Sequence, residues 1–236
     1  GEVDAARIPA DRRPSGGVAH HDMIHPRRAL QYLLDDPDAR RTPEAIDLQR
    51  LFREMLDAGD DAVALEASSH GSHYRRLDRV RFDALVFTNL TPEHLDLHGD
   101  MEEYFQAKRR LFTGLTPPPA AVNVGDPYGR RLADELGGAH RAPLVTFGLR
   151  PEAEVRADDL ELGPHGSTFT AAGIPLATRL PGIFNVENVI GAVAGALLLD
   201  VGEDAIVEGV SGVAGVPGRF ESVDEGQEFA VVVDYA

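Results

Sequence analysis

Two stretches of the sequence, DAVALEASSH at residues 61–70 and DALVFTNLTPEH at residues 83–94, share one design. In each stretch, a short apolar run ends in a group of polar residues. We expect strands at residues 62–65 and 84–87, because short apolar runs between polar residues are typical of buried strands. The polar groups then lie at the carboxyl ends of these strands, which is where ligands gather in an open parallel sheet.

Helical patterns alternate with these strands. The segment TPEAIDLQRLFREMLDAG, residues 42–59, predicts a helix with Thr42 as its N-cap and Pro43 at its first position. The segment MEEYFQAKRRLFTGL, residues 101–115, predicts a helix that carries Lys108 on its apolar face. Further strand and helix patterns continue to Leu149. This alternation predicts an α/β fold with a mostly parallel sheet flanked by helices.

The pattern changes after Leu149. Residues 154–180 hold short alternating runs separated by Gly and Pro, which predict small antiparallel hairpins. Residues 185–199 and 203–213 predict two helices, and two strands are expected on either side of residues 224–226. The sequence therefore predicts a small antiparallel β subregion beside the parallel sheet.

Composition excludes several classes of function. The formal net charge is -16, whereas general binding to nucleic acid or to an anionic membrane needs a basic face. The chain has no cysteine, which excludes disulfides, thiolate catalysis and zinc–thiolate sites. No apolar run approaches the roughly 20 residues of a membrane span, and the first residues show no apolar signal core. We expect a cytoplasmic protein with no nucleic-acid or membrane partner.

Lysine is almost absent from the chain. Lys108 is the single lysine among the 23 lysine and arginine residues, and it lies between Ala107 and Arg109. A phosphate-binding P-loop needs a lysine that follows glycine and precedes serine or threonine. The sequence of 236 residues therefore contains no P-loop.

Several segments in one order resemble the central, ATP-binding domain of the Mur ligases of peptidoglycan synthesis, most of all the MurE type. They are EASSH at 66–70, the run from Arg75 to Phe112, LPGIFNVENVIGAVAGALL at 180–198, VPGRFESVDEG at 216–226 and VVVDYA at 231–236. The resemblance implies a P-loop-NTPase-like central domain at residues 42–218. It also implies the start of a further ligase domain at residues 219–236, and it leaves residues 1–41 poorly defined.

The resemblance implies a magnesium site at the strand ends. Glu66 and His94 would be metal ligands, and Lys108 would carry a carbamate that supports a second magnesium; His94 and Lys108 would also be catalytic. Arginine cannot form such a carbamate because its guanidinium stays protonated, whereas the pKa of lysine falls readily on burial. From the residues alone, a helix-capping Glu66, a loop-packing His94 and a Lys108 that extends to solvent remain alternatives.

Other positions are implied to bind substrate and nucleotide. Thr42, Ser68 and Arg76 would contact the muramoyl-peptide substrate, and Asn185, Asn188, Arg219 and Asp234 would contact ATP. The chain departs from the family pattern at Arg41, where a threonine is usual, and at Tyr74, where a glutamine is common. Without the resemblance, a solvated Arg76 and helix-capping asparagines are equally good readings.

The implied activity is ATP-dependent amide-bond formation, in which a diamino acid joins UDP-N-acetylmuramoyl-L-alanyl-D-glutamate through an acyl phosphate. Complete enzymes of this family also have an N-terminal uridine-binding domain, a P-loop and a C-terminal amino-acid domain, none of which the sequence shows. We therefore expect the chain alone to be inactive or barely active unless another chain supplies the P-loop. A non-catalytic remnant or a substrate-binding module is the alternative.

Overall fold

The computed structural model of the chain describes residues 2–7, 42–92, 95–114, 116–138, 142–215, 221–223, 226–227 and 231–233. Its main sheet has five strands in the order β2-β1-β3-β4-β5. They are β1 (Glu2–Arg7), β2 (Ala62–Leu65), β3 (Ala84–Phe87), β4 (Ala120–Asn123) and β5 (Leu144–Phe147). Strands β3, β4 and β5 are parallel to one another. The predicted α/β class is therefore confirmed, and β2 and β3 have the predicted bounds.

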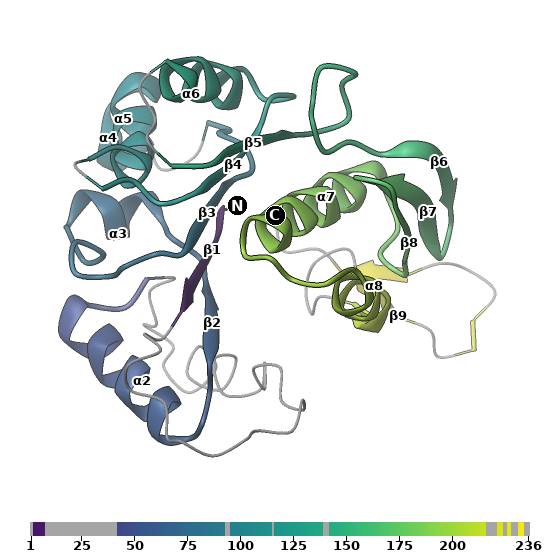
Figure 1. Ribbon diagram of the computed structural model, residues 1–236, viewed down its shortest axis with the longest axis horizontal. Coiled ribbons are helices and arrows are strands. Elements are labelled where there is room, and N and C mark those ends of the chain that lie inside the picture. Colours follow the sequence, from purple (N-terminus) through teal and green to yellow (C-terminus); the bar gives the residue numbers. More distant parts are fainter. Residues whose placement is uncertain are drawn as a thin grey trace.

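Helices cover both faces of this sheet (Figure 1). The helices α2 (Ala45–Asp57), α3 (Ser69–His73), α4 (Leu95–His98), α5 (Met101–Phe112) and α6 (Pro127–Gly137) lie on one side, and α7 (Ile183–Leu198) lies on the other. Successive side chains of a strand point to opposite faces. Leu85 and Phe87 therefore join the core under α5 and α6, whereas Val86 joins the core under α7. Strand β3 thus connects two apolar cores.

Strand β1 lies inside the sheet, where the sequence analysis placed no strand. It pairs antiparallel with β2, for example Asp4 with Leu65, and antiparallel with β3, for example Val3 with Val86. The segment EVDAAR is short and half charged, so it has no apolar run that marks it as a strand. Its place comes from pairing with two strands far along the chain.

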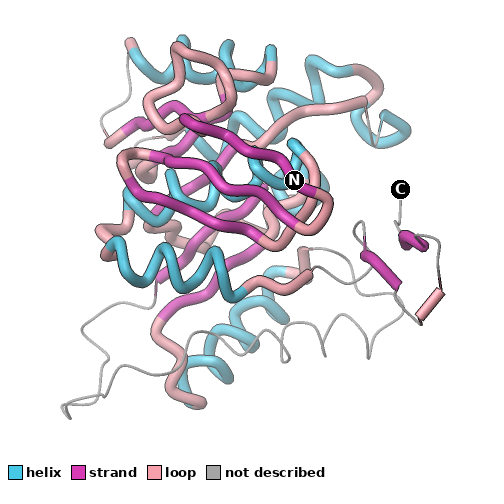
Figure 2. Tube along the Cα trace, turned by 90° about the vertical axis from the view of Figure 1, so that its right-hand side faces the viewer, coloured by secondary structure: helices cyan, strands magenta, loops and turns pink. Residues whose placement is uncertain are grey.

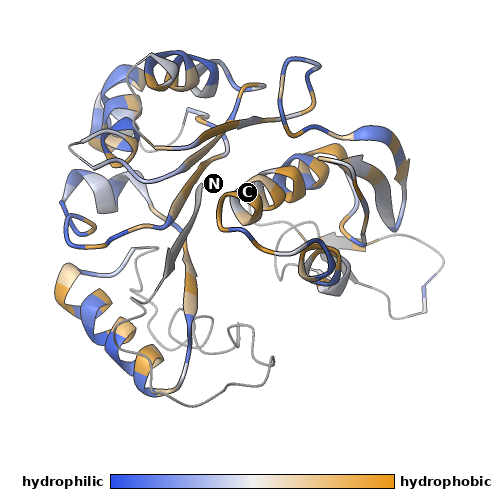
Figure 3. Ribbon diagram, in the orientation of Figure 1, coloured by the Kyte–Doolittle hydropathy of each residue, from blue (hydrophilic) through white to orange (hydrophobic). Residues whose placement is uncertain are grey.

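A separate antiparallel sheet follows, as predicted. It contains β6 (Asp158–Gly163), β7 (Gly166–Ala171) and β8 (Ile174–Thr178), which lie side by side in Figure 2. Phe169 and Leu176 of this sheet share a core with Ile190 of α7 and Ile206 of α8 (Glu203–Gly212). Helix α7 is apolar along most of its length (Figure 3), since both sheets pack on it. A short pair, β9 (Glu221–Val223) and β10 (Val231–Val233), confirms the two strands expected near the end.

The start of α2 differs from the prediction. The N-cap of this helix is Glu44, two residues after Thr42. Thr42 is fully buried, and its hydroxyl group bonds to residues outside the helix. The predicted capping role of Thr42 is therefore wrong, because a tertiary contact takes the hydroxyl that a helix cap would use. Pro43 likewise lies before the N-cap and is not the first helical residue.

Helices α5 and α6 are joined by charged side chains. Arg131 donates to Glu102 over 2.9 Å and to Glu135 over 3.0 Å, and Arg109 also bonds to Glu135. The Arg131 guanidinium lies 4.4 Å from the centroid of the Phe105 ring. The hydrogen bond from Arg131 lowers the pKa of Glu102 to about 2. This network fixes the outer face of α5, whose inner face carries Lys108.

No helix among the described residues is long and apolar enough to cross a membrane.

Replacing Glu102 with glutamine is expected to lower the urea midpoint modestly near neutral pH, because the ion pair with Arg131 is exposed. The pKa of Glu102 is about 2 in the folded chain against an ordinary value of 4.5. The contribution of Glu102 is therefore present above the ordinary value and is lost as the pH falls through the folded value. The measurement is the difference in urea midpoint between wild type and Glu102→Gln across this pH range. Glu103→Gln, at the exposed neighbouring position, is the matched control. A difference in urea midpoint that does not shrink as the pH falls would contradict the contribution assigned to the Glu102–Arg131 ion pair.

Candidate functional site

Thr42 contacts Ser68, another predicted substrate-binding residue, at the carboxyl end of β2. Its Oγ1 lies 2.8 Å from Ser68 Oγ and accepts the backbone N–H of Ser68 over 3.0 Å. The same Oγ1 lies 3.2 Å from the backbone oxygen of Glu66. Ser68 in turn caps α3, since its Oγ accepts the N–H of Gly71. The loop before α2 is therefore bound directly to the turn between β2 and α3.

Arg76 belongs to the same network. Its Nη1 donates to the backbone oxygen of Thr42 over 3.1 Å, and its Nη2 lies 2.7 Å from a carboxylate oxygen of Glu44. The side chain of Arg76 is 5% exposed, whereas that of Glu44 is 57% exposed. The guanidinium also lies 5.3 Å from the centroid of the Tyr74 ring. A solvated Arg76, the alternative left open by the sequence, is excluded, and Glu44 is a partner that the sequence analysis missed.

Glu66 follows β2 directly and is exposed to solvent. A carboxylate at this position fits a hard cation, which prefers oxygen ligands. The described residues contain no group of three or more histidine, cysteine, aspartate or glutamate side chains that could hold a metal ion. The described part of the chain therefore supplies at most two such ligands in one place. Mg²⁺ commonly binds proteins through only one or two carboxylates, with water and substrate phosphates completing its shell.

Lys108 lies on the inward face of α5, as predicted. It is 5% exposed, and Tyr104, Phe105 and Phe112 are buried beside it on the same helix. Its Nζ lies 5.5 Å from the centroid of the Tyr104 ring. At the preceding residue of α5, the backbone oxygen of Ala107 accepts a hydrogen bond from the hydroxyl group of Ser72 in α3. The helix that follows β2 is thus attached to the turn of α5 that carries the lysine.

The two predicted nucleotide-binding asparagines lie in the first turns of α7. Asn188 is exposed, and Asn185 is half-buried with its amide nitrogen donating to the backbone oxygen of Pro181 over 2.7 Å. Because the first N–H groups of a helix have no partner within it, polar ligands can bind at such a start. The N-cap of α7 is Gly182, so the capping reading of the asparagines is wrong; Asn185 stabilises its own turn, and the exposed amide of Asn188 can still bind a polar ligand.

Glu187, between these asparagines, faces the carboxyl end of β4. Burial raises the pKa of its carboxyl and the charge of Asp126 raises it further, while a hydrogen bond with Asn123 acts in the opposite direction. The side-chain oxygen of Asn123 accepts the N–H of Gly125 over 2.8 Å. The sequence analysis missed this group, although Asn123 and Asp126 follow an apolar run in the same way as Glu66 and Ser68 do.

Three predicted site residues lie outside the described residues. They are His94, Arg219 and Asp234. Of the two positions that depart from the family pattern, Arg41 also lies outside the described residues, whereas Tyr74 is described. The roles expected for these three residues stay predictions.

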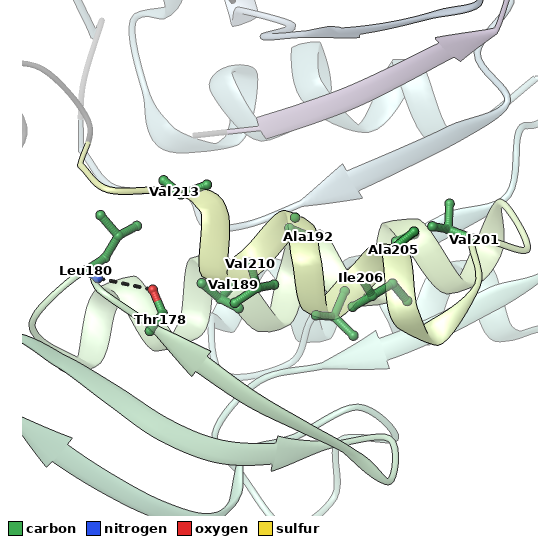
Figure 4. Close-up of a pocket in the computed structure, with 12 residues that line it drawn as sticks. Thr178, Leu180, Val189, Ala192, Val201, Ala205, Ile206, Val210 and Val213 are labelled. Atoms are coloured by element: carbon green, nitrogen blue, oxygen red, sulfur yellow. Dashed lines mark hydrogen bonds between the residues drawn. The ribbon is translucent and has the colours of Figure 1, made fainter. Parts of the chain in front are cut away.

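One hollow of the described structure is lined almost entirely by aliphatic side chains. A cavity of about 230 Å³ opens between α7, α8 and the end of β8, and Figure 4 shows the aliphatic side chains around it. Its polar lining group, the hydroxyl of Thr178, accepts the N–H of Leu180 over 3.1 Å. An apolar cavity of this kind offers no group for acid, base or metal chemistry. The chemistry-bearing residues instead gather at the strand ends.

Comparison with known proteins gives the family. The chain matches the Mur ligase middle domain over residues 22–196, which is most of its length. The chain therefore belongs to the Mur ligase family. The resemblance stated from the sequence is confirmed, as is the fold class.

The relatives specify the type of ligase to which the chain is similar. It is 48% identical over 204 residues to UDP-N-acetylmuramoyl-L-alanyl-D-glutamate--2,6-diaminopimelate ligase of Streptomyces coelicolor, covering 84% of this chain and 40% of the relative. The ligase of the same name from Geobacter metallireducens is 46% identical over 211 residues, with 85% and 40% covered. The chain thus spans about 40% of the length of these curated relatives.

Solved structures agree on the fold. One UDP-N-acetylmuramoyl-L-alanyl-D-glutamate--2,6-diaminopimelate ligase superposes with a TM-score of 0.72 at 30% identity, covering 82% of this chain and 41% of that one. A pseudomurein peptide ligase type C from Methanothermus fervidus gives a TM-score of 0.55 at 20% identity, with 69% and 40% covered. The second likeness shows the fold alone.

Replacing Gly71 with alanine is expected to break the contact between Thr42 and Ser68. A Cβ at Gly71 would lie 2.6 Å from Thr42 Cγ2 and 2.9 Å from Thr42 Oγ1. Inserting a methyl group into such packing typically costs about 1–3 kcal/mol, and we expect that loss in the free energy of unfolding. Gly209→Ala in α8 is the matched control, because a Cβ there meets nothing within 4 Å. Urea unfolding measures both, and equal midpoints for the two variants would contradict the expected clash.

Proposed function

We propose that this chain forms the central domain of a MurE-type ligase, which uses ATP to join a diamino acid to UDP-N-acetylmuramoyl-L-alanyl-D-glutamate. Relatives that are 40% to 48% identical carry the name of a 2,6-diaminopimelate ligase acting on this dipeptide. The observation that carries the proposal is that Thr42, Ser68 and Arg76 form one hydrogen-bond network. These are the three positions that the family resemblance implies for substrate contact.

The proposed reaction makes an amide bond in two steps. The terminal phosphoryl group of ATP moves to the carboxylate of the D-glutamate residue and ADP leaves. The amine of the diamino acid then attacks the carbonyl carbon, phosphate leaves, and the nitrogen loses a proton to water. Neither step needs a covalent bond to the protein, so the contribution of the chain is positioning and charge neutralisation. The hydrogen bonds that join Thr42, Ser68 and Arg76 suit that task, since they hold these side chains in one arrangement.

Arg76 is the proposed partner of the substrate carboxylate. A guanidinium offers paired N–H donors that match the two oxygens of a carboxylate. In the structure, the exposed carboxylate of Glu44 takes one side of this group. We infer that a substrate carboxylate exchanges with Glu44, because Glu44 is half open to solvent while Arg76 is anchored by the backbone oxygen of Thr42.

Glu66, Lys108 and His94 are the proposed metal-binding residues. The Glu66 carboxylate supplies oxygen directly, and Lys108 would supply it only as a carbamate. That carbamate forms when the neutral amine attacks the carbon of carbon dioxide, making a C–N bond and releasing one proton to water. Bound magnesium would neutralise negative charge on the phosphates of ATP. His94, with Lys108, is the proposed catalytic pair.

ATP is the proposed ligand of the start of α7 and of two residues near the end of the chain. Asn185 and Asn188 belong to the proposed nucleotide set, and Asn188, which has the exposed amide, would lie near the adenine. Arg219 and Asp234 complete the proposed nucleotide set. The cytoplasmic location expected from the sequence belongs to this proposal.

A second function, substrate binding without catalysis, is favoured by the absence of a P-loop from the 236 residues. Backbone N–H groups of a P-loop surround the phosphates, and the lysine of the loop reaches the terminal ones. We therefore propose that ligation requires a polypeptide segment with a P-loop in addition to these residues. The domain division at residues 42–218 and 219–236 is proposed on the same family pattern.

Calorimetric titration with UDP-N-acetylmuramoyl-L-alanyl-D-glutamate tests the substrate site. We expect saturable binding, and we expect Arg76→Ala to weaken it by about tenfold to a hundredfold, since hydrogen bonds to charged groups contribute about 1.5–3 kcal/mol. Arg79→Ala, at an exposed position in the same arginine-rich run, is the matched control. No binding by folded wild-type chain would contradict both proposed functions, whereas equal loss in the two variants would contradict the role of Arg76.

Carbamate formation is tested with ¹³C-labelled bicarbonate and carbon NMR. We expect a carbamate signal from the side chain of Lys108, and any second carbamate signal would come from the N-terminal amine, because the chain holds no other lysine. Lys108→Arg keeps the positive charge but cannot react, so the signal should vanish in this variant. A spectrum of the wild-type chain identical to that of Lys108→Arg would contradict the carbamate.

A further inference from the structure

His98 is a buried histidine to which the proposed reaction assigns no task. It ends α4 and is 2% exposed. A tight turn follows: Gly99 has a φ of 74°, and the N–H of Asp100 donates to the backbone oxygen of His98 over 2.9 Å. Asp100 then caps α5. This turn folds the His98 ring back over the first turn of α5, where it stacks on the ring of Tyr104 at 5.0 Å and 10°.

Tyr104 connects His98 to Lys108. Tyr104 and Lys108 are four positions apart on α5, so their side chains lie on the same face of the helix. Helical side chains also lean toward the N-terminus of their helix, which directs the stem of Lys108 back over Tyr104. The distance of 5.5 Å from Lys108 Nζ to the ring centroid is within the range of a cation–π contact. The Tyr104 ring thus contacts both the His98 ring and the lysine.

His98 also contacts α3. His70 and His73 present their rings edge-on to His98, with centroids at 6.0 Å and 5.7 Å. Helix α3 begins immediately after Ser68, at the strand end that carries the proposed substrate and metal residues. His98 therefore packs between the element that follows Glu66 and the ring that contacts Lys108. A shift of His98 would therefore move α3 relative to the Tyr104 ring.

We propose that His98 is a positioning residue for Lys108, which it holds through the ring of Tyr104. This inference rests on the proposed function only for its consequence: a carboxylate on Lys108 serves the strand end only if the lysine stem points there. The unmodified lysine makes this contact without ATP or substrate, whereas a carbamate would remove the cation and leave the ring in contact with the lysine stem. His98 acts through Tyr104 and has no assigned contact with reacting atoms.

Selective labelling makes the proposal directly measurable. Lysine labelled with ¹³C at Cε gives one side-chain signal in this chain, since Lys108 is the only lysine. The face of an aromatic ring shields nearby protons, so the Hε protons of Lys108 should lie upfield of those of an exposed lysine and differ from each other. We expect His98→Leu to lose most of this displacement. We expect His98→Phe to keep it, because a phenyl ring can stack on Tyr104.

Two further variants define the controls. Tyr104→Leu should abolish the displacement, which identifies the ring that causes it. His165→Leu removes an exposed histidine in the turn between β6 and β7 and should change nothing. The circular dichroism of each variant establishes that it is folded. The experiment uses neither substrate nor bicarbonate, so failure of the proposed function in its own tests leaves this result intact.

The outcomes are decisive in each direction. Loss of the displacement in folded His98→Leu, with retention in His98→Phe, supports the proposal. An unchanged Lys108 signal in folded His98→Leu overturns it. If His98→Leu does not fold, His98→Phe and Tyr104→Phe decide instead, because each keeps two rings that can stack. Loss of the displacement in either of those variants would then overturn the proposal.

Discussion

The arrangement of the proposed substrate site depends on the hydrogen bonds of the Thr42 hydroxyl group. Thr42 is fully buried, and buried polar groups are stable only when they are hydrogen-bonded. Its partners belong to the turn after β2, and the backbone oxygen of the same residue holds Arg76. One residue therefore fixes the loop before α2, the start of α3 and the guanidinium together. Mutational effects at these positions should not add, because residues of one network share partners.

Local pattern predicted most of the fold, and its failures have physical causes. The bounds of β2 and β3 follow from apolar runs that polar residues end, and α5 follows from a three- and four-residue spacing. Strand β1 could not be found this way, since half of its residues are charged and its place depends on pairing with β2 and β3. The N-cap of α2 was misplaced because the Thr42 hydroxyl serves a partner 26 residues away.

The site was predictable where it depends on strand ends and on helical faces. Glu66 and Ser68 follow a strand, and the inward position of Lys108 follows from the period of α5. The counter-ion of Arg76 is Glu44, more than 30 residues earlier, and no local signal announces that pair. The stacking of His98 on Tyr104 depends on the turn at Gly99, and no local pattern in the sequence indicates that contact.

The near absence of lysine also affects the surface of the chain. The cations that join α5 to α6 are arginines, and their partners raise the pKa of Arg131 further above its usual value. A lysine in the same place would lose its proton as the solution becomes strongly alkaline, whereas a guanidinium keeps its charge. Reagents that acylate primary amines would likewise leave these contacts untouched. The contact between α5 and α6 is thus vulnerable to acid, and it tolerates both base and the modifications that neutralise lysine.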